Sequence, residues 1–205
     1  ELRRYLQQEK YLDQFYDVEN FIRNQGSNLV VADLACGTGW TSSLISKLDE
    51  VQKIYSVEFS EHRIVDLFPK TIEMLEGKKN KIYRCFGSFY DCKIDPATVD
   101  IVYLSQAFHH ADKPILLATE CKRILKKGGK VIIIGEKTIT KRFLVVRYLK
   151  NLLKNRKIVP TLSDLLPKDL VKGDNHFPAE TYDFIWGGLD FKWLYSNNFS
   201  SGMSV

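Results

Sequence analysis

The chain has 205 residues, a formal net charge of +5 and 44% hydrophobic residues. This length suffices for one domain with a buried core and is short for two, and the composition is typical of a globular protein. Because no run approaches the roughly 18 apolar residues of a membrane-spanning helix, we expect no membrane span. The first residues show no pattern typical of a signal peptide.

The four cysteines are Cys36, Cys85, Cys92 and Cys121. They form no CxxC pair and no regular framework of the kind that small secreted domains use. We therefore expect reduced thiols and a cytoplasmic protein.

Hydrophobic spacing predicts helices and strands in alternation. Residues 1–25 carry apolar and aromatic side chains at helical spacing, which indicates one or two amphipathic helices ending at Gly26. Strands are expected at 29–34, 53–59, 81–86, 99–105 and 130–136. Helices are expected at 40–48, 61–76 with a kink or break at Pro69, 114–125 with a stop at Gly128–Gly129, and 179–187.

Short apolar strands that alternate with helices are typical of an α/β fold: a doubly wound, Rossmann-like, mostly parallel sheet with helices on both faces. We expect a single domain over 1–205. Its parts are N-terminal helices (1–28), a core (29–136), a lid-like insertion (137–178), and a last helix with a C-terminal strand (179–205). Such sheets bind ligands at the carboxyl ends of their central strands.

The segment 30–42, VVADLACGTGWTS, joins the first strand to the next helix through a glycine turn. Gly37 and Gly39 permit positive φ, and the helix N-terminus offers several free backbone N–H groups. A triphosphate site requires GxxxxGK[ST], which is absent, and a dinucleotide site prefers a third glycine where Ser42 stands. Asp33 disfavours pyrophosphate and suits a ligand with an ammonium group. A tight turn without a ligand is the alternative.

The ends of the second and third strands add two features. Glu58, in VEFS, can accept two hydrogen bonds from a ribose diol, and Phe59 can cover an adenine ring. In the loop GSFYDC (87–92), Ser88 and the Phe89 backbone can bond the base. A solvated charge at a strand end is the alternative for Glu58. The combination fits adenine, ribose and an amino acid tail, which together make S-adenosylmethionine.

The chain resembles the class I S-adenosylmethionine-dependent methyltransferases, in particular the group that acts on small molecules (type 11-like). The matching segments are VVADLACGTG (30–39), VEFS (57–60), GSFYDC (87–92), GDNHFPAETYDFI (173–185) and above all VDIVYLSQAFHHADKPILLATECKRILKKGGKVIIIGE (99–136). The resemblance implies S-adenosylmethionine as cofactor and S-adenosylhomocysteine as product. It implies these cofactor-binding residues: Asp33, Ala35, Gly37, Thr38, Gly39, Glu58, Phe59, Ser88, Phe89 and Ser105.

Two positions depart from the family pattern. Ala35 replaces the first glycine of the turn, and its small side chain should still let its carbonyl face the ligand's amino group. Ser88 stands where the family usually has an aspartate, so adenine affinity should be lower. These departures leave a second interpretation open, in which the protein is a methyltransferase-like binding or scaffold subunit with weak turnover. A nicotinamide-dependent oxidoreductase is disfavoured by Ser42 and Asp33.

Methyl transfer is a direct displacement that depends mostly on positioning and on exclusion of water. His109 and His110 follow the fourth strand and are the candidates for a base or a substrate contact, with a structural role as the alternative. His176 is a weaker candidate. Trp40 and Tyr11 can close over the methionine end, although simple packing explains both.

Two absences narrow the acceptor. The sequence has no [ND]PP[YF] after the fourth strand, the motif that holds the planar nitrogen in families that methylate nucleobase or glutamine amines. It also has no evident ligand set for Mg²⁺, so we expect no metal site. A small-molecule O-, N- or C-nucleophile remains. The oligomeric state is open.

Residues 137–157 hold eight Lys and Arg and no acid, so the positive charge is local and does not indicate nucleic acid binding. Three roles are open for this basic segment: a lid helix with a solvated face, attraction of an acidic substrate or partner, or contact with a membrane surface.

Overall fold

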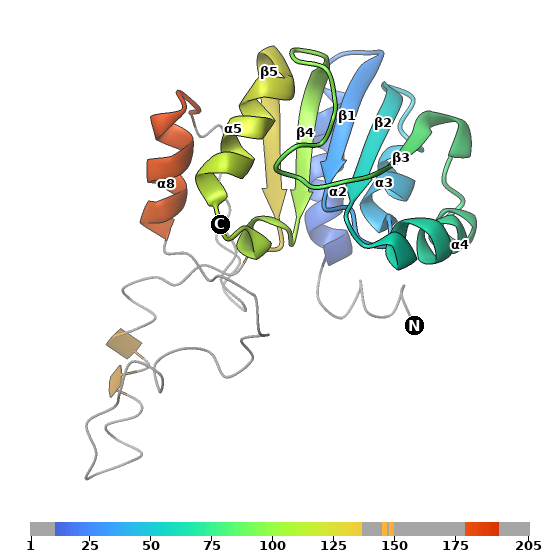
Figure 1. The fold of residues 1–205 in the computed structure, drawn as a ribbon. Helices are drawn as coiled ribbons and strands as arrows, with labels where there is room; N and C mark the ends of the chain where they lie inside the picture. The colour runs from blue at the N-terminus through green and yellow to red at the C-terminus, as the bar shows by residue number, and fades with distance from the viewer. Residues whose placement is uncertain (1–10, 137–144, 147, 150–178, 193–205) are drawn as a thin grey trace. The chain divides into compact units, whose positions relative to one another are not determined.

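The computed structural model describes residues 11–136, 145–146, 148–149 and 179–192 (Figure 1). The chain forms two compact units. The first consists of Glu1–Phe108 and Lys113–Glu136, and the second of His109–Asp112 and Lys137–Val205. Within the described residues, no helix is long and apolar enough to cross a membrane.

The first unit is built on a five-stranded sheet with the order β3-β2-β1-β4-β5. Its strands are β1 (Leu29–Leu34), β2 (Val51–Glu58), β3 (Ile82–Phe86), β4 (Val99–Ser105) and β5 (Leu125–Ile134). Every neighbouring pair is parallel. The predicted α/β fold is therefore confirmed. The strand order reverses between β1 and β4, which is where such sheets bind ligands.

Helices cover both faces of this sheet (Figure 1). The helices α2 (Tyr11–Arg23) and α3 (Trp40–Ile45) lie behind the sheet in Figure 1, and α5 (Pro114–Ile124) lies in front. The amphipathic pattern of α2 buries Tyr11, Phe15 and Ile22 in one core cluster with strand residues such as Val31. This pattern explains why residues 11–23 are helical. Residues 1–10, which belong to the same prediction, lie outside the described part.

The predicted helix at 61–76 is helical without a gap from residue 61 to residue 74, but it changes type before its proline. A π-helical turn spans Arg63–Leu67 and leads directly into α4 (Phe68–Met74), which has Pro69 in its first turn. Proline removes one N–H donor from the helix, and a π-helical turn is a usual irregularity at such a place.

We predicted that Gly128 and Gly129 stop the helix that begins at Pro114, and this prediction is wrong. The helix α5 ends at Ile124, where Leu125 already has an extended backbone. Gly128 and Gly129 lie inside β5, at the place where its register with β4 shifts. Gly128 has φ +80°, so it supplies the irregular backbone of this bulge.

No helix joins β3 to β4, although residues 87–98 are all described. A buried polar contact holds this connection instead: Glu120 on α5 accepts hydrogen bonds from the Cys92 backbone N–H (2.9 Å) and thiol (3.0 Å). Arg123 donates to both oxygens of the same carboxylate. The Arg123 and Cys92 hydrogen bonds outweigh burial and lower the pKa of Glu120 to about 2.

The second unit contains helix α8 (Ala179–Gly188), as the sequence predicts for 179–187. Trp186 in this helix meets Phe191 edge to face, with ring centroids 5.2 Å apart. In the basic segment, Val145, Val146, Tyr148 and Leu149 are helical. The rest of the predicted insertion and the predicted C-terminal strand lie outside the described residues.

Candidate active site

The glycine turn follows β1 at the carboxyl edge of the sheet. Ala35 (φ 55°), Gly37 (φ 57°) and Gly39 (φ 80°) all have left-handed backbone conformations. A Cβ on Gly37 would meet no atom within 4 Å, whereas a Cβ on Gly39 would lie 1.9 Å from the Phe68 ring. The two glycines therefore differ in role: Gly37 borders open space, and Gly39 lets α4 pack against the start of α3.

The backbone of Ala35 is strained, and a glycine at this position would not be. A left-handed backbone costs an L-residue about 1–2 kcal/mol. Its φ of 55° explains why glycine is preferred at this position of the pattern. The small size of the alanine side chain does not reveal this cost, which comes from the backbone conformation.

Asp33, at the end of β1, is completely buried. Its Oδ2 accepts hydrogen bonds from the hydroxyls of Thr41 and Ser42, both at 2.5 Å. Its Oδ1 is buried and has no hydrogen-bond partner among the described residues. Burial raises the pKa of Asp33 to about 6, against the opposing effect of the two hydroxyls. A carboxylate with one unused oxygen is thus held behind the turn.

Ser42 has a structural reason to replace the third glycine of a dinucleotide turn. It is fully buried, and its hydroxyl lies 2.5 Å from Asp33 Oδ2 and 2.8 Å from the Ser56 hydroxyl on β2. The helix α3 is therefore fastened to two strands through this hydroxyl. This arrangement requires a side chain where a dinucleotide turn requires none.

Glu58, the last residue of β2, is only 2% exposed. Its Oε2 accepts a hydrogen bond from the Gly37 N–H at 2.9 Å, and its Oε1 accepts one from the Ser60 N–H at 2.8 Å. Glu58 is thus no solvated strand-end charge, and each of its oxygens keeps a second lone pair. The turn also offers fewer free N–H groups than we predicted, because Gly37 N–H serves Glu58 and Gly39 N–H bonds the Cys36 carbonyl.

Aromatic side chains stand exposed at the same edge. Phe59 is 73% exposed and Phe86 is 68% exposed, at the ends of β2 and β3. In the next loop, Phe89 packs edge to face on Tyr90, with centroids 4.6 Å apart. The Ser88 hydroxyl is exposed, and its oxygen accepts a hydrogen bond from the Tyr90 N–H. Thr38 is half-buried in the turn.

Two further buried groups lie where β4 and β5 end. Glu136, two residues after β5, is 1% exposed, and its Oε1 accepts hydrogen bonds from the Ala107 and Phe108 N–H groups, both at 3.0 Å. It thereby caps the short 3₁₀ turn Phe108–His110. The sequence does not single out Glu136, although it contains a signal for it: an acid follows the fifth strand closely, much as Glu58 ends the second. Ser105 Oγ is buried and has no partner in the described part.

The two candidate histidines, His109 and His110, fall in the second unit. The strand β4, which precedes them in the chain, falls in the first. The rings of His109 and His110 lie side by side, with centroids 4.2 Å apart. His176 lies outside the described residues. Trp40 and Tyr11 are both 8% exposed, and Trp40 meets Phe15 edge to face at 6.3 Å, so packing accounts for Trp40.

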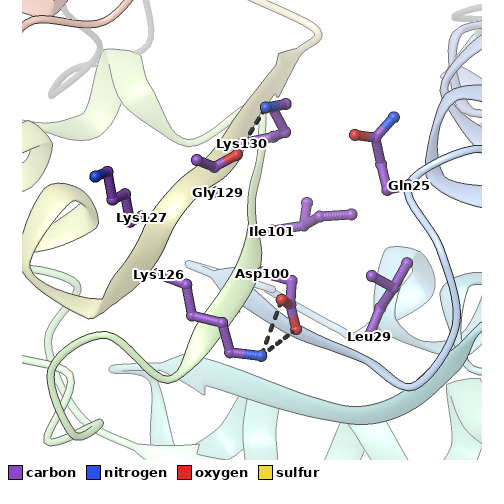
Figure 2. A pocket seen from close by; sticks show the side chains of 9 residues that line it. Gln25, Leu29, Asp100, Ile101, Lys126, Lys127, Gly129 and Lys130 are labelled. Carbon is purple, nitrogen blue, oxygen red and sulfur yellow. Dashed lines mark hydrogen bonds and ion pairs between the residues drawn. The ribbon is translucent and has the colours of Figure 1, made fainter.

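A pocket also lies at the opposite, amino edge of the sheet (Figure 2). Its lining includes Leu29 at the start of β1, Asp100 near the start of β4, and Lys126. Lys126 Nζ lies 2.8 and 2.9 Å from the two Asp100 oxygens, as Figure 2 shows. The described residues contain no group of three or more His, Cys, Asp and Glu side chains that could hold a metal ion.

The fold and the carboxyl edge define an α/β protein with two buried acids around a glycine turn. A methyltransferase domain family matches residues 32–133. A demethylmenaquinone methyltransferase of Bacillus mycoides is 29% identical over 101 residues, which is 49% of this chain and 41% of that protein.

Solved structures agree in fold. The YcgJ protein of Bacillus subtilis superposes with a TM-score of 0.59 at 14% identity, covering 84% of this chain and 67% of that one. An S-adenosylmethionine-dependent methyltransferase from Aquifex aeolicus gives 0.57 at 17% identity, covering 90% and 79%. Residues 32–133 thus belong to a methyltransferase domain family. It spans about two-fifths of the length of the curated relatives that it matches.

Proposed function

We propose that this domain binds S-adenosylmethionine at the carboxyl edge of β1, β2 and β4 and transfers its methyl group to a small-molecule nucleophile. The observation that carries the proposal is the pair of buried carboxylates, Asp33 and Glu58, on either side of the glycine turn. A nucleoside with a cationic tail suits both acids, because its ribose hydroxyls can donate to Glu58 and its ammonium group can donate to Asp33. A dinucleotide would bring its pyrophosphate against Asp33, where charge repulsion is unfavourable.

The side chains fit such a cofactor. Glu58 has one free lone pair on each oxygen for the two ribose hydroxyls, and its bond to Gly37 ties the ribose site to the turn. The exposed Phe59 offers a ring for the adenine, and the Phe89 backbone a polar edge. Asp33 Oδ1, Ser105 and the carbonyl of Ala35 are available to the amino acid tail, and Thr38 and Gly39 complete the turn.

The bound cofactor would supply an activated sulfonium methyl group. The chain's own contribution is to hold the nucleoside, to align an acceptor with the methyl group and to exclude water. Glu136 fixes the backbone at Phe108, and His109 and His110 follow immediately, so we retain these histidines as candidates for accepting a proton from the acceptor.

The names of the curated relatives and the basic segment each point to a class of acceptor. Quinone-related hydroxyl or ring-carbon acceptors deserve testing, because curated relatives are named demethylmenaquinone methyltransferases. The basic segment leaves an acidic acceptor among the candidates. The four unpaired thiols support a reducing compartment such as the cytoplasm.

Isothermal titration calorimetry with S-adenosylmethionine, S-adenosylhomocysteine and NAD tests the proposal. We expect both sulfur nucleosides to bind and NAD not to bind. Failure of both to bind at millimolar concentration would contradict the proposal, and binding without turnover on a broad acceptor panel would favour the scaffold interpretation.

A single substitution locates the ribose site. Glu58→Ala should weaken S-adenosylhomocysteine binding about 50-fold, because two hydrogen bonds to a carboxylate are lost. Glu61→Ala is the matched control, since Glu61 is an exposed acid three residues further along. Unchanged affinity in Glu58→Ala would remove Glu58 from the site.

A further inference from the structure

Three buried polar atoms without hydrogen-bond partners in the described part of the first unit lie at the carboxyl halves of β1 and β4. They are Asp33 Oδ1, the Tyr103 hydroxyl and Ser105 Oγ. Buried polar groups are almost always hydrogen-bonded, and leaving one unpaired is costly. Three such atoms on two adjacent strands therefore suggest a binding site.

The sheet register brings these residues to one face. Asp33 is the register partner of Tyr103 across β1 and β4. Ser105 is two residues further along β4, so its side chain leaves the same face as that of Tyr103. Burial raises the pKa of Tyr103 well above its usual value, and the nearby Asp33 carboxylate raises it further.

The hydrogen bonds of Asp33 indicate which side of its carboxyl group is used. The hydroxyl of Ser42 contacts Asp33 Oδ2 and also Ser56, which is the register partner of Asp33 on β2. The β2 side of the carboxyl group is thus engaged in the fold. The unused oxygen remains for the β4 side, where Tyr103 lies.

We propose that Tyr103 is a ligand-binding residue, and that its hydroxyl completes with Asp33 Oδ1 and Ser105 Oγ a buried site for a primary ammonium group. A primary ammonium has three N–H donors, and the three atoms offer three acceptors, one of them anionic. This inference rests on the proposed function, in which the ammonium group belongs to the cofactor's amino acid tail. It adds a residue that selects ligands by that tail.

The test compares two ligands that share a nucleoside and differ in the tail. S-adenosylhomocysteine carries the ammonium group, and 5′-methylthioadenosine lacks it. We expect Tyr103→Phe to weaken S-adenosylhomocysteine about tenfold, in line with the loss of one hydrogen bond to a charged group. We expect 5′-methylthioadenosine affinity to stay within about twofold.

The variant should fold, because the hydroxyl that it removes has no partner in the structure's described residues. Tyr83→Phe is the control, since Tyr83 is 50% exposed on the edge strand β3. Ser105→Ala gives a second measurement and should show the same selectivity between the two ligands.

Each outcome separates the inference from the proposed function. If wild-type protein binds S-adenosylhomocysteine and Tyr103→Phe binds it equally well, the inference is wrong and the proposed function stands. If Tyr103→Phe weakens both ligands by one factor, the hydroxyl does not read the ammonium group and the inference is also wrong. If wild-type protein binds neither ligand, the proposed function is wrong as well.

Discussion

The two edges of the same sheet use charge in opposite ways. At the amino edge, the Asp100 carboxylate accepts hydrogen bonds from the Val30 N–H and from Lys126. At the carboxyl edge, Asp33 is fully buried, opposes no lysine or arginine in any contact of the described residues, and keeps one oxygen unused. The first arrangement stabilises the fold. The second costs stability, and such a cost is typical of a site prepared for a ligand.

The largest effect on the difference between the two edges is expected from Asp33→Asn. The amide oxygen can still accept from Thr41 and Ser42, while the charge disappears. We expect S-adenosylhomocysteine affinity to fall about 100-fold, and the free energy of unfolding at pH 7 to rise by about 2 kcal/mol because a buried charge is removed. Calorimetry and urea unfolding measure the two effects. A variant that binds like the wild type would place Asp33 among purely structural residues.

The pH dependence of stability tests whether the buried charge of Asp33 destabilises the folded protein. The pKa of Asp33 is about 6 in the folded protein and has a reference value of 3.8, so the folded state holds this proton more tightly than the unfolded chain does. The stabilising contribution is complete below about pH 4 and is lost as pH rises to about 6. The difference in unfolding free energy between wild type and Asp33→Asn should therefore change by about 2 kcal/mol between pH 4 and pH 6, out of about 3 kcal/mol for the whole shift. A constant difference from pH 4 to 7 would contradict the shift.

The amino edge should respond to mutation in stability alone. Asp100→Ala leaves the Val30 N–H without its acceptor and removes the pair with Lys126. We expect a loss of about 1–2 kcal/mol in urea unfolding. S-adenosylhomocysteine affinity should remain within about twofold, and a large loss of affinity would show that the two edges are coupled.

The smallest expected effect concerns Ala35. Because its φ is 55°, Ala35→Gly relieves backbone strain and should raise unfolding stability by about 1 kcal/mol, partly offset by the greater entropy of unfolded glycine. Ligand affinity should change by no more than about twofold. The opposite substitution at a matched position, Gly37→Ala, should destabilise the protein, since Gly37 has φ +57° and the same strain would be introduced.

The sequence predicted the order of the elements well, because apolar strands and amphipathic helices have periods that can be read locally. It also located Asp33 and Glu58 as acids at strand ends. It did not predict that β5 takes up Gly128 and Gly129, because a bulge depends on pairing with β4. It gave no reason to single out Tyr103, which stands in a run of apolar residues and resembles ordinary core until its register partner is known.

Gly39 has a consequence for any saturation mutagenesis of this protein. A side chain at this position would occupy the volume of the Phe68 ring, so almost every substitution should score as a loss of function through loss of folding. Substitutions at Gly37, which faces open space, introduce only the backbone strain of its φ of +57° and should give less stable but folded protein that binds weakly. The two neighbouring glycines would look equally essential in a growth assay, and only a readout of protein abundance would distinguish the packing residue Gly39 from Gly37, which we propose faces the ligand.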